Sequence, residues 1–170
     1  MEKFIIDESH SEIGFKVKHM MFTNVSGKID VYNAVIEAEN DALENAVITF
    51  EGDASSISTG NADRDTHLKS GDFFDVENHP KITFKSTQFD PQGKLEGDLE
   101  IRGVSKPVVL DVDFGGTGKD PWGNTKLGMT LTGKINRKDW GLNWNSALET
   151  GGVLVSDEVR FNIDLQFLKQ

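Results

Sequence analysis

Apolar and polar residues alternate along most of this chain of 170 residues. Ile13, Phe15 and Val17 would share one face of a strand, while Lys16 and Lys18 take the other. The same period of two recurs within residues 46–51, 82–85, 95–102, 108–114, 127–131 and 159–167. Such alternation is typical of antiparallel strands that have one wet and one dry face. The pattern therefore predicts an all-β protein.

Turn sequences separate these runs, which we interpret as eight to ten strands. Strands whose dry faces share one side must close into a barrel or fold into a sandwich. One segment differs, because residues 61–71 predict a short helix with Asn61 as its N-cap and Gly71 as its stop. A weaker helical or irregular stretch is expected over residues 145–151. We find no repeat or linker, so residues 1–170 are expected to form a single domain.

The charge and composition of the chain exclude several classes of function. The formal net charge is -10, which disfavours both nucleic-acid binding and adhesion to an anionic membrane. The chain has no Cys, so disulfides, thiolate metal sites and thiol catalysis are excluded. We see neither a leader pattern nor a long apolar run. These features predict a cytoplasmic protein that does not insert stably into a membrane.

No sequence motif indicates a catalytic group, a metal site or a cofactor-binding site. The segment from Gly128 to Ile135 approaches a phosphate-binding loop, but Ile135 stands where Ser or Thr must reach magnesium. Four acidic or histidine residues crowd one region and admit a metal or acid–base interpretation: Asp65, His67, Asp72 and Asp75. No known ligand spacing is matched there, so we favour the interpretation that they cap and solvate a surface helix. We therefore expect no catalytic residue, no metal and no cofactor.

Several blocks of sequence, in order along the chain, resemble the YceI-like family of polyisoprenoid-binding proteins. They cover residues 7–20, 64–75, 79–86, 99–108, 136–142 and 152–159. Their joint occurrence is specific and spans nearly the whole chain. The resemblance implies a lipocalin-like antiparallel β-barrel of about eight main strands, with a short helix closing one end. It also implies that a long-chain isoprenoid lipid is held in an elongated apolar cavity, and it is compatible with a homodimer.

The dry strand positions supply the candidate ligand-binding residues. An eight-stranded barrel is either filled by side chains or holds one slender ligand. The residues alone favour a filled interior, because protein interiors pack closely, whereas the resemblance favours a hollow one. The wall of a hollow barrel would comprise Phe15, Val17, Phe50, Phe84, Leu99, Ile101, Leu110, Leu127, Met129, Phe161 and Ile163.

Five further residues carry separate expectations. His19 continues the dry alternation and would either meet a quinone or phosphate head or be a hydrogen-bonded core histidine. Trp140 is expected to plug the barrel base, with a place at the cavity mouth as the alternative. Arg137, beside Asp139, is expected to form a structural ion pair. Phe73 and Phe74 are expected to anchor the predicted helix in the core.

Three functions remain open at the level of sequence. The first is a carrier or reservoir for a prenyl compound such as a prenyl quinone, a prenol or a prenyl phosphate. The second is a filled barrel whose protein partner docks outside. The third is an isoprenoid-modifying enzyme that uses the region of Asp65 and His67. The family resemblance favours lipid binding without catalysis.

Overall fold

The computed structural model describes residues 1–146 and 154–170. Its strands are β1 (Glu2–Ile6), β2 (Glu12–His19), β3 (Thr23–Ile29), β4 (Tyr32–Ala38), β5 (Val47–Asp53), β6 (Ile57–Ser58), β7 (Lys81–Phe89), β8 (Lys94–Ile101), β9 (Val104–Lys119), β10 (Thr125–Asn136) and β11 (Val155–Lys169). Its helices are α1 (Ala62–Lys69) and the 3-10 turns η1 (Glu8–His10), η2 (Ala54–Ser56) and η3 (Arg137–Trp140).

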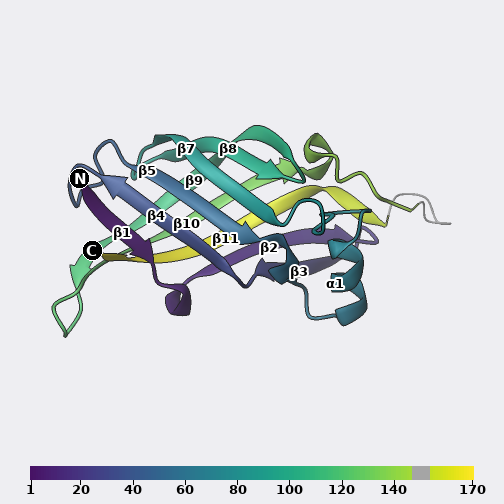
Figure 1. Cartoon of the computed structure of the whole chain (residues 1–170), viewed down its shortest axis with the longest axis horizontal. Helices are drawn as coiled ribbons and strands as arrows, with labels where there is room; N and C mark the ends of the chain where they lie inside the picture. Colours follow the sequence, from purple (N-terminus) through teal and green to yellow (C-terminus); the bar gives the residue numbers. More distant parts are fainter. Residues whose placement is uncertain (147–153) are drawn as a thin grey trace.

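These strand segments form one antiparallel barrel with eight strand positions (Figure 1). Both β1 and β2 pair with β11, at Phe4↔Lys169 and at Phe15↔Phe161. On their other edges, β1 pairs with β4 and β2 pairs with β3. Next in the ring, β4 pairs with β5 and β3 pairs with β6. The couples β1 and β2, β4 and β3, and β5 and β6 therefore each act as one bent strand, and β7 to β11 complete the ring. The predicted lipocalin-like barrel of about eight strands is confirmed.

A polar corner at η1 produces the bend between β1 and β2. The Asp7 carboxylate accepts a hydrogen bond from the Ser9 amide at 3.1 Å and lies 2.7 Å from Nδ1 of His10. The Ser11 hydroxyl donates to the Asp7 carbonyl at 2.7 Å and accepts from the Gln166 amide at 2.9 Å. These bonds hold the corner against β11. The start of the first sequence block that resembles the YceI-like family, residues 7–20, therefore has a structural role.

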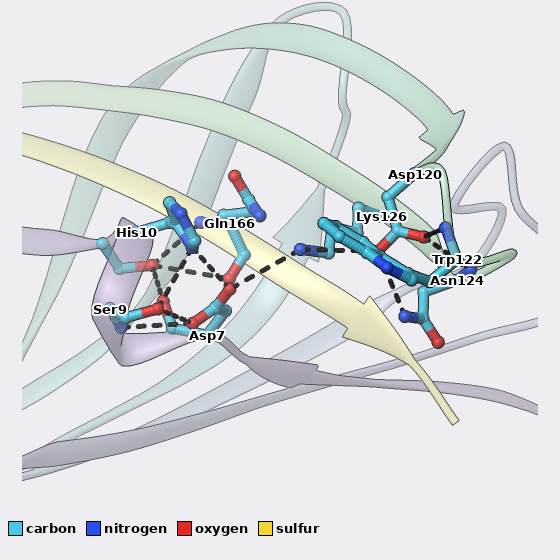
Figure 2. Close-up of polar contacts among 9 residues, drawn as sticks. Asp7, Ser9, His10, Asp120, Trp122, Asn124, Lys126 and Gln166 are labelled. Atoms are coloured by element: carbon cyan, nitrogen blue, oxygen red, sulfur yellow. Dashed lines mark hydrogen bonds and ion pairs between the residues drawn. The ribbon is translucent and has the colours of Figure 1, made fainter.

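One lysine ties this corner to the hairpin between β9 and β10. Nζ of Lys126 lies 3.9 Å from the Asp7 carboxylate and 3.7 Å from that of Asp120 (Figure 2). Asp120 in turn accepts hydrogen bonds from the amides of Trp122 and Asn124, both at 2.9 Å. A side-chain oxygen that bonds backbone amides two and four residues onward stabilises a tight turn. The indole of Trp122 projects from this hairpin and is 82 % exposed.

The single α-helix of the described residues lies at the barrel end opposite the two termini (Figure 1). Asn61 is its N-cap, as predicted, and its side-chain oxygen accepts from the Arg64 amide at 2.9 Å. The helix ends slightly earlier than expected, because Ser70 rather than Gly71 is the C-cap. Most of the predicted irregular stretch over residues 145–151 lies outside the described residues.

The barrel interior is packed solid near the chain termini. Five of its largest fully buried side chains come from β1, β4, β10, β11 and the β4–β5 connection: Phe4, Ile36, Leu43, Leu127 and Phe167. Close packing of large apolar side chains excludes water and leaves no passage at this end. The opposite half, toward α1, is different.

Candidate functional site: an apolar cavity in the barrel

A cavity of about 550 Å³ runs inside the barrel from α1 as far as Ile48, Leu95 and Leu165. Its wall comes from β2, β3, β5 to β11 and α1, and most of the lining side chains are apolar. Pockets that hold small organic ligands fall in the range of about 300–1,000 Å³. The interior is thus packed near the termini and hollow toward α1. The expectation from the residues alone, a barrel filled throughout, is wrong.

Ten of the thirteen predicted ligand-binding residues line this cavity. They are Phe15, Val17, His19, Phe50, Phe84, Leu99, Ile101, Leu110, Phe161 and Ile163. Leu127, Met129 and Trp140 do not line it. Leu127 pairs with the fully buried Phe167, which places it toward the filled end, whereas Met129 pairs with Leu165, which does line the cavity, so Met129 lies at the edge of the cavity. Alternation gives the face of a strand but not the depth along the barrel, so sequence reasoning placed these two in the wall. Ligand contact by the other ten stays a prediction.

Trp140 is a buried packing residue, but it lies at the α1 end of the barrel, and its expected role as a plug stays a prediction. It is 2 % exposed, and its indole N–H donates to the Leu99 carbonyl at 2.8 Å. It belongs to η3, which begins where β10 ends. A buried indole with its one donor satisfied is a stable packing element. Trp140 therefore packs within the core without contributing to the cavity lining.

Glycines in the barrel wall explain why phenylalanines line a hollow space. A Cβ atom placed on Gly27 would lie 2.3 Å from the ring of Phe15, its partner across β2 and β3. A Cβ atom on Gly97 would lie 2.5 Å from the ring of Phe84. Each ring thus lies across a neighbouring glycine, against the wall, where any larger residue would block it. The space in the middle of the barrel stays open.

Polar and charged groups collect where the cavity meets α1. They are Lys18, His19, Thr59, Asn61, Asp63, Arg64, His67 and Arg137. Arg64 is fixed there, since its Nε donates to the Thr59 hydroxyl at 2.7 Å and its Nη2 to the Thr59 carbonyl at 2.8 Å. The Asp65 carboxylate accepts from the Thr59 amide at 2.9 Å and also from its hydroxyl. The mouth of the cavity therefore carries ordered cationic and hydrogen-bonding groups.

A cluster of aromatic rings and the guanidinium of Arg137 form one side of this mouth. The rings of His67 and Trp144 meet edge to face, with centroids 4.6 Å apart, and Trp144 lies 5.5 Å from Phe73. The guanidinium of Arg137 stands over the Phe73 ring at 5.9 Å. Nε2 of His67 lies 2.9 Å from the Asp72 carboxylate. Phe73 and Phe74 both line the cavity. Phe74 packs against the hydrophobic core, as expected, whereas the buried Phe73 packs against His67 and Trp144.

Arg137 makes a structural ion pair, but Asp157 rather than Asp139 is its partner. Only 3 % of Arg137 is exposed, and its Nη2 lies 3.9 Å from the Asp157 carboxylate. Its other donors reach the carbonyls of Ser156, at 2.9 Å from Nε, and Leu142. Burial lowers the pKa of Arg137 from its ordinary value, and Asp157 partly opposes this. The side chain closes the cavity wall where η3 meets the start of β11.

The acidic cluster around α1 separates into local contacts. Asp65 bonds Thr59, Asp72 bonds His67, and the Asp75 carboxylate accepts from the Asn78 side chain at 3.0 Å. Across residues 1–146 and 154–170, no three His, Cys, Asp or Glu side chains converge as metal ligands would. The capping interpretation fits this arrangement.

Sequence reasoning missed several cavity residues for identifiable reasons. Ile57 and Leu68 lie on β6 and α1, which show no strand alternation. Trp144 follows η3 in an irregular segment, so neither period places it. Ile13 and Val25 do alternate in phase with Phe15 and Gly27, and this signal would have found them.

A closed antiparallel β-barrel with an apolar cavity open to a polar mouth defines a lipocalin-like binding barrel. The model of the YceI-like domain matches residues 4–167, and the chain belongs to the YceI-like family. It is 39 % identical over 168 residues to a UPF0312 protein of Staphylococcus aureus strain N315, covering 98 % of both chains.

Solved structures agree with this assignment. The YCEI protein of Campylobacter jejuni is 34 % identical, with a TM-score of 0.75 over 94 % of both chains. A polyisoprenoid binding domain from Saccharophagus degradans is 14 % identical, with a TM-score of 0.67 over 96 % of this chain and 97 % of that one. No helix of the described residues is long and apolar enough to cross a membrane.

Proposed function

We propose that this protein binds a long-chain isoprenoid lipid in its barrel, tail inward and head at the α1 end, and acts as a carrier or reservoir. The observation that carries the proposal is the polarity of the cavity. Its apolar lining ends against packed side chains at one end and in cationic and hydrogen-bonding groups at the other. A lipid with one long tail and one polar head has the same polarity.

The tail supplies most of the binding energy in this proposal. Each methylene removed from water contributes about 0.8 kcal/mol, so a few isoprene units suffice for tight binding. The head is then placed by Lys18, Arg64 and His67 at the mouth. These groups favour a head that accepts hydrogen bonds or carries negative charge, as a quinone, a prenol or a prenyl phosphate does. The fold shared with the Saccharophagus degradans polyisoprenoid binding domain supports the same class of ligand.

We propose binding without catalysis. An isoprenoid-modifying enzyme that used Asp65 and His67 would need them to act together on one substrate. Asp65 instead bonds Thr59, and His67 bonds Asp72. A loss of turnover in His67→Ala with lipid binding retained would be required to support the enzyme.

Native mass spectrometry of freshly purified protein, followed by organic extraction and lipid mass spectrometry, tests the proposal. We expect a stoichiometric prenyl species that is released by denaturation. Protein that is empty and also fails to take up added prenyl quinones, prenols or prenyl phosphates would refute it and favour a protein-interaction role. The same spectra report subunit number, and so test the homodimer, which with the cytoplasmic location stays a prediction.

A further inference from the structure

The turn between β2 and β3 presents three large apolar side chains to solvent. Met20, Met21 and Phe22 are 42 %, 58 % and 84 % exposed. Met20 and Met21 both have positive φ, at 53° and 64°, and the Phe22 amide donates to the His19 carbonyl at 3.2 Å. Two left-handed residues in a tight hairpin normally call for Asn and Gly. Here the sequence places methionines at both positions and a phenylalanine beside them.

This apolar tip lies beside the mouth of the cavity. His19, the residue before it, lines the cavity. The Met20 amide donates to the Leu154 carbonyl at 2.8 Å, and Leu154 also lines the cavity. The hairpin and α1 stand at the same end of the barrel, opposite the termini (Figure 1).

The hairpin that carries the tip is basic, although the protein as a whole is acidic. Residues 13–29 contain Lys16, Lys18 and Lys28 and no Asp or Glu, in a chain of net charge -10. Lys16 and Lys18 are exposed on β2, while Lys28 lies 3.7 Å from the Asp30 carboxylate. Arg160 pairs with Lys16 across the strands, and its Nε bonds the Glu158 carboxylate at 2.9 Å. Lys28 and Arg160 are thus paired with acidic side chains, and Lys16 and Lys18 give the strand that leads to the tip its local positive charge.

We infer that this hairpin docks the barrel mouth onto an anionic lipid bilayer, where the lipid ligand enters and leaves. The purpose of docking rests on the proposed function, because isoprenoid lipids dissolve in bilayers. Apolar side chains enter the interface, and lysines near the surface meet anionic headgroups. Three side chains are too few for a stable protein–protein interface, which buries about 1,200 Å² or more. They suit brief contact with a membrane.

Flotation with vesicles free of isoprenoid tests docking alone. We expect the protein to bind vesicles of phosphatidylcholine with about a third phosphatidylglycerol, and to bind less to phosphatidylcholine alone or at high salt. The triple variant Met20→Asn, Met21→Gly, Phe22→Thr removes the apolar tip and supplies residues that favour this turn. The affinity of this variant for the vesicles should fall about tenfold or more. Lys16→Gln should lose about fivefold on the anionic vesicles only.

Trp122→Ser is the matched control, because it removes an equally exposed aromatic side chain from the opposite end of the barrel. It should bind vesicles like the unmodified protein. Docking is refuted if the unmodified protein stays unbound, if the triple variant binds equally well, or if Trp122→Ser weakens binding as much. It is also refuted if the tip substitutions only abolish self-association in sedimentation analysis, which would identify a second copy as the partner.

A separate measurement keeps the two proposals distinguishable. Titration of a short, soluble prenyl quinone into the triple variant should give the affinity of the unmodified protein, since none of the three substituted residues lines the cavity. If neither protein binds the prenyl quinone, the proposed lipid-binding function is refuted. The docking proposal is then judged by the vesicle experiment alone. Loss of binding in the variant alone would contradict a tip that acts only in docking.

Discussion

Arg137 is the one buried charged side chain among the described residues, and it holds three parts of the mouth together. It bonds carbonyls at the start of β11 and after η3, and it stacks on Phe73 beside α1. A buried guanidinium is favourable only while its donors remain paired. Replacing Arg137 removes all of these contacts together.

Arg137→Met should lower the free energy of unfolding by about 3 kcal/mol, because the carbonyls that it satisfies become buried and unpaired. Urea denaturation monitored by tryptophan fluorescence measures the loss. The neighbouring Lys138→Met is the control, since Lys138 meets the same Asp157 at 3.4 Å but is solvated. Its effect should stay below about 1 kcal/mol. Equal losses in the two variants would contradict a structural role specific to Arg137.

The glycine beneath Phe15 is a second residue on which the cavity depends. Gly27→Ala places a methyl group where the ring lies, so the ring must turn toward the middle of the barrel. We expect affinity for the longest prenyl tails to fall about fivefold or more while short tails bind nearly as before. Calorimetric titration with tails of two lengths measures the difference. Gly118→Ala, with nothing within 4 Å of its added methyl group, should change neither affinity.

At the level of elements, the corner between β1 and β2 depends on ionised Asp7. Hydrogen bonds from Ser9 and then His10 lower the pKa of Asp7 below its ordinary value of about 3.9. A lowered pKa means that the carboxylate stabilises the fold at pH values above about 3.9, and that this contribution is lost as acid protonates it. The corner is therefore expected to weaken first in acid.

Asp7→Asn keeps a capping oxygen but cannot ionise. Between about pH 6 and pH 3 the unmodified protein should lose on the order of 1 kcal/mol more free energy of unfolding than the variant. Urea unfolding at the two pH values measures this difference. Asp111→Asn, which removes an exposed partner of Lys94, should follow the unmodified protein more closely. A variant that loses as much stability in acid as the unmodified protein would contradict the role of Asp7.

The β2–β3 hairpin keeps its apolar tip at a cost in stability. Left-handed backbone at a residue other than glycine or asparagine costs on the order of 1 kcal/mol. Met20→Asn with Met21→Gly should therefore raise the free energy of unfolding by about 1–2 kcal/mol, as measured by thermal and urea denaturation. A loss of stability would show that the methionines pack favourably where they are.

For the molecule as a whole, periodicity predicts the fold far better than the site. Alternation assigns Phe15 and Val17 to the cavity wall, where they are found. It assigns Leu127 and Met129 to the same wall, which they do not line. Leu127 lies deeper, beside Phe167, and Met129 lies at the edge of the cavity, beside Leu165. Depth depends on register along β11, which local sequence does not encode. The pairing of Arg137 with Asp157 is equally hidden, because the two residues are brought together only by closure of the barrel.

The length of the ligand tail is a property that the whole barrel sets. Removing one isoprene unit from a tail that lies within the cavity should weaken binding at least about tenfold, given about 0.8 kcal/mol for each methylene. Beyond the length that fills the cavity, further units should add little. A series of prenols titrated against one protein preparation measures the profile. An affinity that is independent of tail length would exclude the cavity as the binding site.

Among the described residues, the packed side chains of Phe4, Ile36, Leu43, Leu127 and Phe167 close the barrel near the termini, so a lipid tail would enter and leave at the α1 end. A lipid would enter such a barrel with the tip of its tail first and leave with that tip last. It could not pass through the barrel from one end to the other. Loading and unloading are then the same path run in opposite directions. The protein itself sets no direction of transfer. Net flow would follow the difference in lipid concentration between the two surfaces that the mouth visits.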